Sequence, residues 1–393
     1  MLSVRSRGLA LLGFFVAAAF ACVFWQRIIV NSDRASDLPV HIEYASQITG
    51  LSDIRSPHFL FELLIKALSS LTGASLMTAT AILLGGCYGL MAVLIAHEIK
   101  RRGSAVSDVT AAALSVAILV ASHIFLPTIF KPNLYYNYLV PTAYHNPTQQ
   151  LNKLFTIAIW FLYCRRFLTS DERPLSSLVL LGVLVVASAI AKSSFLIAFL
   201  PVSGLLAAWD LFHGRWSRFR DYVAAIALPA IAVMGWQFWM TYGIGAERRL
   251  SGGILEQSGG IEFAPLAIFA GPASYAQYLA TLPLALAFPL VATILLWPDA
   301  HQSRSFVAAW AILGLGLFYV LLLAESGPRR MAGNFGWTAQ TAAFLLYVEA
   351  LLLMARKWET RFKPVLLVVL SVHVACGVLF ALANALFPAE LWA

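Results

Sequence analysis

The chain has 393 residues, of which 60% are hydrophobic and only 12% charged, and its mean hydropathy is +0.78. This composition excludes a water-soluble globular protein and indicates a polytopic membrane protein. The net charge of +8 does not call for nucleic acid as a partner, because membrane topology and anionic lipids already account for the basic residues.

Apolar stretches of membrane-spanning length recur along the chain and predict about eleven transmembrane helices. The expected fold is an all-α, polytopic transmembrane helical bundle that forms a single integral membrane domain over residues 1–393. A further stretch, His58–Leu71, is too short to cross and predicts an interfacial or re-entrant helix. The predicted spans are Leu9–Val30, Ser75–His97, Ala105–Phe125, Gln149–Phe167, Leu175–Ala191, Ser193–Phe212, Tyr222–Tyr242, Ser274–Trp297, Ser305–Ala324, Trp337–Met354 and Val365–Phe387.

Lysines and arginines predict the orientation, because they concentrate in the cytoplasmic loops of membrane proteins. With a cytoplasmic N-terminus, the basic clusters Lys100–Arg102, Arg165–Arg166 and Arg356–Lys357 all fall on the cytoplasmic side. The C-terminus is then external, as are the loops at about 31–57, 126–148, 243–273 and 325–336. We expect a multi-pass protein of the bacterial inner membrane whose long loops lie in the periplasm.

The first predicted external loop carries a polar island, Asn31–His41, directly after the first span. Its side chains Asp33, Asp37 and His41 can take a proton from a hydroxyl, or hold a divalent cation such as Mg²⁺ or Mn²⁺. Pro39 favours a short helix that runs to Gly50, with Ser36 or Asp37 near its N-terminal cap, and Asp37 and His41 then lie one turn apart on one face. The alternative interpretation is an aspartate that only caps the helix, beside an interfacial histidine.

Two further polar groups lie at predicted external ends of spans. Tyr144, His145 and Asn146 combine aromatic and amide groups, a mixture that binds sugars, although an aromatic belt at the membrane interface is the simpler interpretation. Lys192 stands between two spans with almost no loop. It can bind a lipid phosphate or extend its ammonium group toward lipid headgroups.

The segment Glu325–Trp337 is the last polar group on the predicted external side. It contains two adjacent arginines, Arg329 and Arg330, where the positive-inside tendency disfavours them. Guanidinium groups bind phosphate in a bidentate manner, and Glu325 can orient one of them. An arginine–glutamate ion pair between two helices is the alternative. Asn334 and Trp337 complete the segment.

The first hundred residues contain the pattern Asp37-x-x-x-His41-Ile42-x-x-Ala45, followed by Pro57–Phe61 at the entry to the next helix. This order resembles the GT-C superfamily of membrane-embedded glycosyltransferases. The acidic pair that commonly follows the first span in that superfamily is absent. The later runs, Glu-Ser-Gly-x-Arg among them, are similar to multispan proteins of bacterial surface-polysaccharide assembly.

The resemblance implies transfer of a sugar from a polyprenyl-phosphate-linked donor to a glycan or lipid acceptor on the non-cytoplasmic face, within a membrane of lipid partners and without nucleic acid. Asp37, or Asp33, is then the base or the ligand of a divalent cation, and His41 orients that carboxylate. The residues expected to bind the donor phosphate are Arg329, Arg330 and Lys192. Those expected to bind substrate are His58, Tyr144, His145, Asn146, Glu325, Asn334 and Trp337.

Three other functions fit the same sequence. A polymerase or ligase of surface polysaccharide, of the O-antigen or capsule type, would use the external arginines without an aspartate base. A flippase or transporter of lipid-linked glycans would rely on ionisable groups within the bilayer, for which Glu349 and Lys153 are the candidates. A non-catalytic scaffold would need none of the polar groups.

Overall fold

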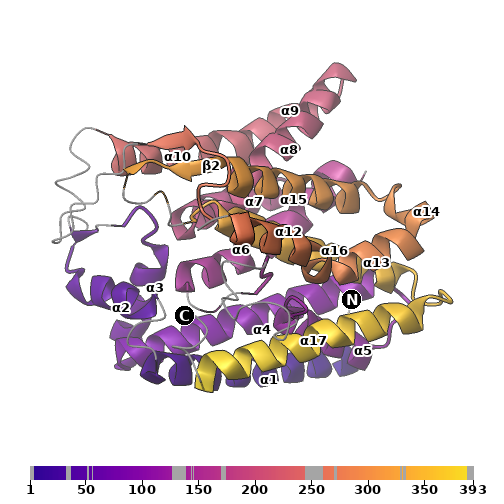
Figure 1. Ribbon diagram of the computed structural model, residues 1–393, viewed down its shortest axis with the longest axis horizontal. Helices are drawn as coiled ribbons and strands as arrows, with labels where there is room; N and C mark the ends of the chain where they lie inside the picture. The colour runs from indigo at the N-terminus through magenta and orange to yellow at the C-terminus, as the bar shows by residue number, and fades with distance from the viewer. Residues whose placement is uncertain are drawn as a thin grey trace.

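The computed structural model describes residues 4–31, 37–50, 53–54, 56–125, 139–142, 144, 146–169, 174–243, 260–269, 272–327, 330 and 333–386. These ranges form a bundle of long helices, which confirms the all-α membrane architecture (Figure 1). Within them, seven helices are long and apolar enough to cross a membrane. An eighth span results if the pair α12–α13, bent by 51°, counts as one.

Helices make up nearly all of the described secondary structure, and two short strands complete it. In chain order, the elements are α1 (Val4–Asn31), α2 (Leu38–Gln47), α3 (Leu60–Thr72), α4 (Leu76–Arg102), α5 (Asp108–Val120), α6 (Pro147–Tyr163), the π-helical turn η2 (Cys164–Leu168), α7 (Leu175–Ala191), α8 (Ser194–Phe212), α9 (Trp216–Tyr222), the π-helical turn η3 (Val223–Ala227), α10 (Leu228–Tyr242), β1 (Ile261–Phe263), α12 (Pro272–Ala285), α13 (Ala287–Leu295), α14 (Trp297–Ala300), α15 (Arg304–Leu322), β2 (Leu323–Glu325), α16 (Gly336–Arg356) and α17 (Lys363–Leu386).

Two of the predicted spans correspond to helices that are short for a membrane span. α5 has 13 residues and α7 has 17, whereas a bilayer core requires about 20. α6 continues without a break into η2, so the helix of the predicted span Gln149–Phe167 reaches from Pro147 to Leu168. Beyond α5 the chain is extended: the Ser122 amide donates to the His373 carbonyl at 3.1 Å, and the Ile124 amide to the Leu284 carbonyl at 3.4 Å. These bonds satisfy backbone groups that a longer helix would have paired internally. The helix lengths therefore do not confirm a count of eleven spans.

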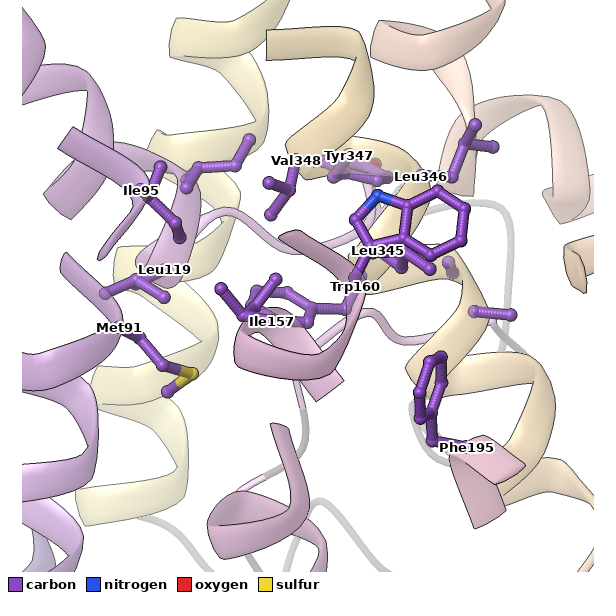
Figure 2. Packing of buried hydrophobic residues seen from close by; sticks show 14 of the residues in the cluster. Met91, Ile95, Leu119, Ile157, Trp160, Phe195, Leu345, Leu346, Tyr347 and Val348 are labelled. Carbon is purple, nitrogen blue, oxygen red and sulfur yellow. The ribbon is translucent and has the colours of Figure 1, made fainter. Parts of the chain in front are cut away.

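α16 is the central helix of the bundle and is buried along almost its whole length. Its sequence is apolar on all sides, as a helix surrounded by other helices requires. It packs against α4, α6, α8, α13 and α15. Figure 2 shows Ile157 and Trp160 of α6 pointing toward the Leu345–Val348 segment of α16, with Met91 of α4 farther along the same cluster.

α1 lies at the edge of the bundle, where Phe15 and its apolar neighbours are exposed as a lipid-facing surface would be. Its other face packs closely on α4 at Gly85 and Gly89, which lie one turn apart. A Cβ atom on Gly85 would lie 2.5 Å from the Cys22 Sγ and 2.9 Å from the Ala18 carbonyl oxygen. Small residues thus allow the two helix backbones to approach, as is common between membrane helices.

A network of ion pairs ties the helices together at the Arg102 end of α4. The Arg102 guanidinium donates to both carboxylate oxygens of Glu349 in α16, at 3.1 and 3.2 Å, and to Glu98 at 2.8 Å. Arg165 donates to the other oxygen of Glu98 at 2.5 Å. Both carboxylates are almost fully buried. Glu349, a candidate transport group from the sequence, therefore joins α4 to α16.

The opposite end of the bundle carries several of the short elements. α2, α3 and β2 lie there, at the left of Figure 1. β1 and β2 pair antiparallel with Ile261 opposite Glu325 and Phe263 opposite Leu323. These strands were not predicted from the sequence, and β2 shortens the predicted span Ser305–Ala324. The pairing joins two of the predicted external loops.

Candidate functional site

α2 has Pro39 in its first turn, as the sequence predicted, and of the two predicted cap residues Asp37 occupies the N-cap position. The helix ends at Gln47, short of the predicted Gly50. The Asp37 side chain does not cap its own helix. Instead, its Oδ2 accepts a hydrogen bond of 2.6 Å from the Nδ2 of Asn146. The aspartate is partly exposed, so its carboxylate is held by a distant residue and stays within reach of solvent.

Asn146 has a second role, because it caps α6. Its Oδ1 accepts from the Gln149 amide at 2.9 Å and from the Thr148 hydroxyl at 2.7 Å, and Pro147 occupies the first turn. With the oxygen used by the cap, the amide nitrogen is the group that faces Asp37. The start of α6 therefore fixes the orientation of the donor to Asp37.

The first turns of α6 are polar and buried. The Gln149 Nε2 donates to the Trp337 carbonyl at 3.1 Å and to the Thr341 hydroxyl, while its Oε1 accepts from Ser194 at 2.8 Å. Asn152, one turn further, donates to Ser194 at 3.2 Å. These contacts join α6 to the beginnings of α8 and α16.

Lys192 lies between α7 and α8 and belongs to the same group. Its ammonium nitrogen stands 4.6 Å from the ring centroid of Trp337, a cation–π arrangement. Since Gln149 bonds to the Trp337 backbone and lies close to Asn146 in the chain, the contacts run from Asp37 through Asn146 and Gln149 to Trp337 and Lys192. Four predicted site residues are thereby connected.

His41 lies one turn after Asp37 and faces α3. Its Nδ1 is 2.6 Å from the Oε1 of Glu62, which is buried with 1% of its side chain exposed. An ionised carboxylate only accepts hydrogen bonds, so with Glu62 ionised the donor of this contact is His41 Nδ1. His41 therefore belongs to a second polar contact, between α2 and α3.

His58 is held at the start of α3 by Gln237 of α10. The Gln237 Nε2 lies 3.2 Å from the His58 Nδ1 and donates to the carbonyls of Pro57 and Ala189 at 2.8 and 2.7 Å. Ala189 stands at the end of α7, close to Lys192 in the chain. The entry to α3 is thereby fixed beside the end of α7.

Tyr144 is buried in an aromatic cluster. Its ring centroid lies 4.8 Å from that of Phe24, 6.0 Å from that of Trp25 and 5.9 Å from that of Phe380. Burial raises the pKa of the Tyr144 hydroxyl above its usual value. The cluster supports the loop that leads into Asn146.

The segment that follows β2 forms a third contact group. Glu325 accepts from the Tyr242 hydroxyl at 2.8 Å and from the Asn334 amide. Arg330 pairs with Glu262 of β1 at 3.0 Å, and the two side chains are 56% and 38% exposed. An arginine–glutamate ion pair is thus present, and it joins the segment to β1.

Three predicted site residues, Asp33, His145 and Arg329, lie outside the described residues. In the part of the chain that the structure describes, no three His, Cys, Asp or Glu side chains gather as a metal site would require. Asp37 and His41 are bound to Asn146 and Glu62. Asp33, the third expected ligand of a divalent cation, lies outside the described residues, so that cation stays a prediction from the sequence.

Gln149 and Glu62 are the important site residues that were not assigned from the sequence. Gln149 began a predicted span, and Glu62 fell within the predicted interfacial helix. A signal was present, because polar residues within apolar runs are costly unless they are paired. Comparison of the chain with models of known protein families and with curated proteins finds no match.

Proposed function

We propose that this protein is a membrane glycosyltransferase that moves a sugar from a polyprenyl-phosphate-linked donor to a glycan or lipid acceptor on the non-cytoplasmic face. The observation that supports this function best is the contact path from Asp37 through Asn146 and Gln149 to Trp337 and Lys192. It connects a carboxylate with a cation, the two kinds of group that the transfer needs.

Asp37 takes the proton of the acceptor hydroxyl. The hydroxyl oxygen attacks the anomeric carbon of the donor sugar and forms the new glycosidic bond. The bond from that carbon to the phosphate oxygen breaks, and the phosphate leaves with the electron pair. Asn146 binds one carboxylate oxygen of Asp37 and so holds it in position for the transfer.

Lys192 stabilises the negative charge that grows on the leaving phosphate. A positioned cation lowers the barrier most where charge develops in the transition state. The Lys192 ammonium lies over the Trp337 ring in a cation–π contact, which holds it in position. Arg330 also stabilises the leaving phosphate. It can turn to the phosphate at little cost because its ion pair with Glu262 is half exposed, and such pairs contribute only about 0–1 kcal/mol. Arg329 has the same assignment from the sequence.

The proposal includes the finer topology predicted from the sequence: eleven spans in a GT-C-like arrangement, a cytoplasmic N-terminus, and a periplasmic C-terminus in a bacterial inner membrane. The distribution of polar groups between the two ends of the bundle supports this topology. The described candidate residues lie at one end, and the Glu98–Arg102–Glu349 network lies at the other. The positive-inside tendency assigns the network to the cytoplasm.

Transport is less well supported. Of its two candidate groups, Glu349 is bound by Arg102, Trp160 and Ser305 in an arrangement that stabilises helix packing. Lys153 is buried, with its ammonium donating to the Pro141 carbonyl at 2.8 Å. Both groups are thus engaged in contacts within the protein.

The test is transfer of radiolabel from a pool of polyprenyl-phosphate sugars by the purified protein in nanodiscs. We expect product with the wild type and a loss of at least ~100-fold with Asp37→Asn, because general-base catalysis contributes about 10²–10⁴-fold. Glu43→Gln is the matched control, since it removes an exposed carboxylate from the same helix. Full activity of Asp37→Asn, or no product from any donor in the pool, would refute the proposal.

A further inference from the structure

The first turn of α8 is buried and has no cap. Ser193 occupies the N-cap position, and its side chain accepts no hydrogen bond from the helix. The first amides of a helix have no partner within it, and those of Ser194 and Phe195 bond to no other group in the described part of the chain. Both residues are almost fully buried, whereas Ser193 is partly exposed. A helix start of this kind attracts an anion, because its N–H groups and its dipole are positive.

The start of α8 meets the starts of α6 and α16. The Ser194 hydroxyl donates to the Gln149 Oε1 at 2.8 Å, and the Gln149 Nε2 donates to the Trp337 carbonyl at 3.1 Å. Gln149 and Trp337 stand in the first turns of α6 and α16. Asn146 caps α6, and the amides of Trp337 and Thr338 are bonded in the turn before α16. Of these three starts, α8 is the one whose first amides stay open.

Thr338 supplies a second, independent indication of a ligand. Its side chain is 1% exposed, and its hydroxyl has no hydrogen-bond partner among the described residues. Around α16, Thr338 lies between Trp337, whose carbonyl meets α6, and Ala339, which faces Gly316 of α15. α8 packs against α6, α15 and α16 and therefore fills this angle. The Thr338 hydroxyl is thus directed toward the first turn of α8.

Two lysines make the region cationic. Lys192 directly precedes the N-cap of α8 and holds its ammonium over the Trp337 ring. Lys153, one turn after Gln149 on α6, is 2% exposed and donates to a backbone carbonyl. Within the described ranges no carboxylate pairs with Lys153. A buried cation without a carboxylate is costly, and a bound anion offsets that cost.

We propose that the first turn of α8, Lys192 and the Thr338 hydroxyl together bind the phosphate group of a lipid phosphate. The phosphate oxygens accept from the amides of Ser194 and Phe195 and from Thr338, and Lys192 pairs with the charge. That this lipid is the departing polyprenyl phosphate rests on the proposed function, whereas the open helix start does not. The departing monoester carries more negative charge than the diester donor, so the site favours the state in which the bond has broken.

The experiment places a carboxylate of the protein itself beside the open amides. Ser193→Asp does so at the N-cap, where an anion stabilises a helix, and its unfolding temperature should not fall. Ser75→Asp is the matched control, because Ser75 is the N-cap of α4 and already accepts from the Thr78 amide. The probe is farnesyl phosphate, and its Kd is measured by calorimetry in phosphatidylcholine nanodiscs, with empty nanodiscs as background. We expect Ser193→Asp to bind it at least ~10-fold more weakly than the wild type, and Ser75→Asp to bind it equally well.

A second variant tests the side chain. Thr338→Val keeps the shape and removes the hydroxyl, and it should also bind farnesyl phosphate at least ~5-fold more weakly. Farnesol, which lacks the phosphate, should not distinguish the variants from the wild type. Unchanged farnesyl phosphate binding in Ser193→Asp or in Thr338→Val would mean that water alone meets these donors, and would overturn the site.

Two further arms identify the source of the phosphate. Phosphatidic acid in the nanodiscs and inorganic phosphate in solution should each compete at least ~10-fold less well than farnesyl phosphate. Equal competition by either one would overturn the assignment to the departing carrier. Binding that depends on Ser193 without transfer from any donor would keep the phosphate site and refute the transferase. Transfer by Ser193→Asp at the wild-type rate would do the reverse.

Discussion

The carboxylate of Asp37 and the side-chain amide of Asn146 lie 2.6 Å apart, although 109 residues separate them in the chain. The contact brings the loop after α1 against the start of α6. Asn146 is also the N-cap of α6, so the placement of Asp37 depends on how a buried helix begins. We expect changes at either residue to affect transfer in the same way.

Replacing Asn146 should raise the activation free energy of transfer by more than it lowers the free energy of unfolding. In Asn146→Ala the lost helix cap costs about 1 kcal/mol. The released Asp37 carboxylate should lower the transfer rate by ~100-fold, the effect of a small misplacement of a reacting group. Ser107→Ala is the control, because Ser107 caps α5 and removes only a cap. Thermal unfolding and single-turnover transfer, measured side by side, check this prediction. Similar rate losses in both variants would contradict it.

Replacing Lys192 should slow transfer from the donor. Lys192→Met removes the cation over the Trp337 ring, and losing a charge-assisted hydrogen bond to the leaving phosphate costs about 1.5–3 kcal/mol. We therefore expect kcat/KM for the polyprenyl-phosphate donor to fall by at least ~10-fold. Lys363→Met is the control, since Lys363 lies 5.0 Å from the Trp358 ring at the opposite end of the bundle. The same kcat/KM for the donor in both variants would remove Lys192 from the donor site.

Glu349 should matter for stability and not for substrate selection. Glu349→Gln leaves the buried Arg102 charge poorly compensated, and breaking a buried pair costs about 3–5 kcal/mol. We expect a clear fall in the unfolding temperature. Asp299→Asn removes the partner of Lys357 in a more exposed pair, which contributes about 0–1 kcal/mol. Equal unfolding temperatures of the two variants would argue against a structural role for the network.

The close approach of α1 and α4 predicts a third stability effect. In Gly85→Ala the new methyl group meets the Cys22 Sγ and the Ala18 carbonyl, so the helices must separate. Overpacking of this kind costs about 1–3 kcal/mol. Gly86→Ala is matched in sequence and has nothing within 4 Å of the added atom. Thermal unfolding of the two variants in the same detergent compares them, and equal losses would contradict the packing.

Much of the helical framework could be predicted from the sequence, because apolar length is a local property. α7 spans the predicted residues Leu175–Ala191, and the short helix predicted after His58 is α3. The bend at Leu286 between α12 and α13 was missed, although Pro283 and Pro289 stand on either side of it and prolines commonly break or bend helices. β1 and β2 were missed because two three-residue strands carry too short a pattern.

The candidate site was only partly predictable, because hydrogen-bond partners far apart in the chain leave no mark in a single sequence. Polar residues such as Asp37 and Asn146 stand out from their apolar surroundings, but nothing in their spacing pairs them. Arg330 was expected to lie near Glu325 or a phosphate, and its partner in the structure is Glu262. That pairing depends on the strand register, which only the fold determines.

The measurement that tests the central claim most directly is a double-mutant cycle on transfer with Asp37→Asn, Asn146→Ala and the double variant, each corrected for its folded fraction. If Asn146 acts by holding the Asp37 carboxylate, the double variant should be no slower than Asp37→Asn alone, within about 0.5 kcal/mol of barrier. Rate losses that multiply would show that the two residues act independently, which would contradict a site built on their contact.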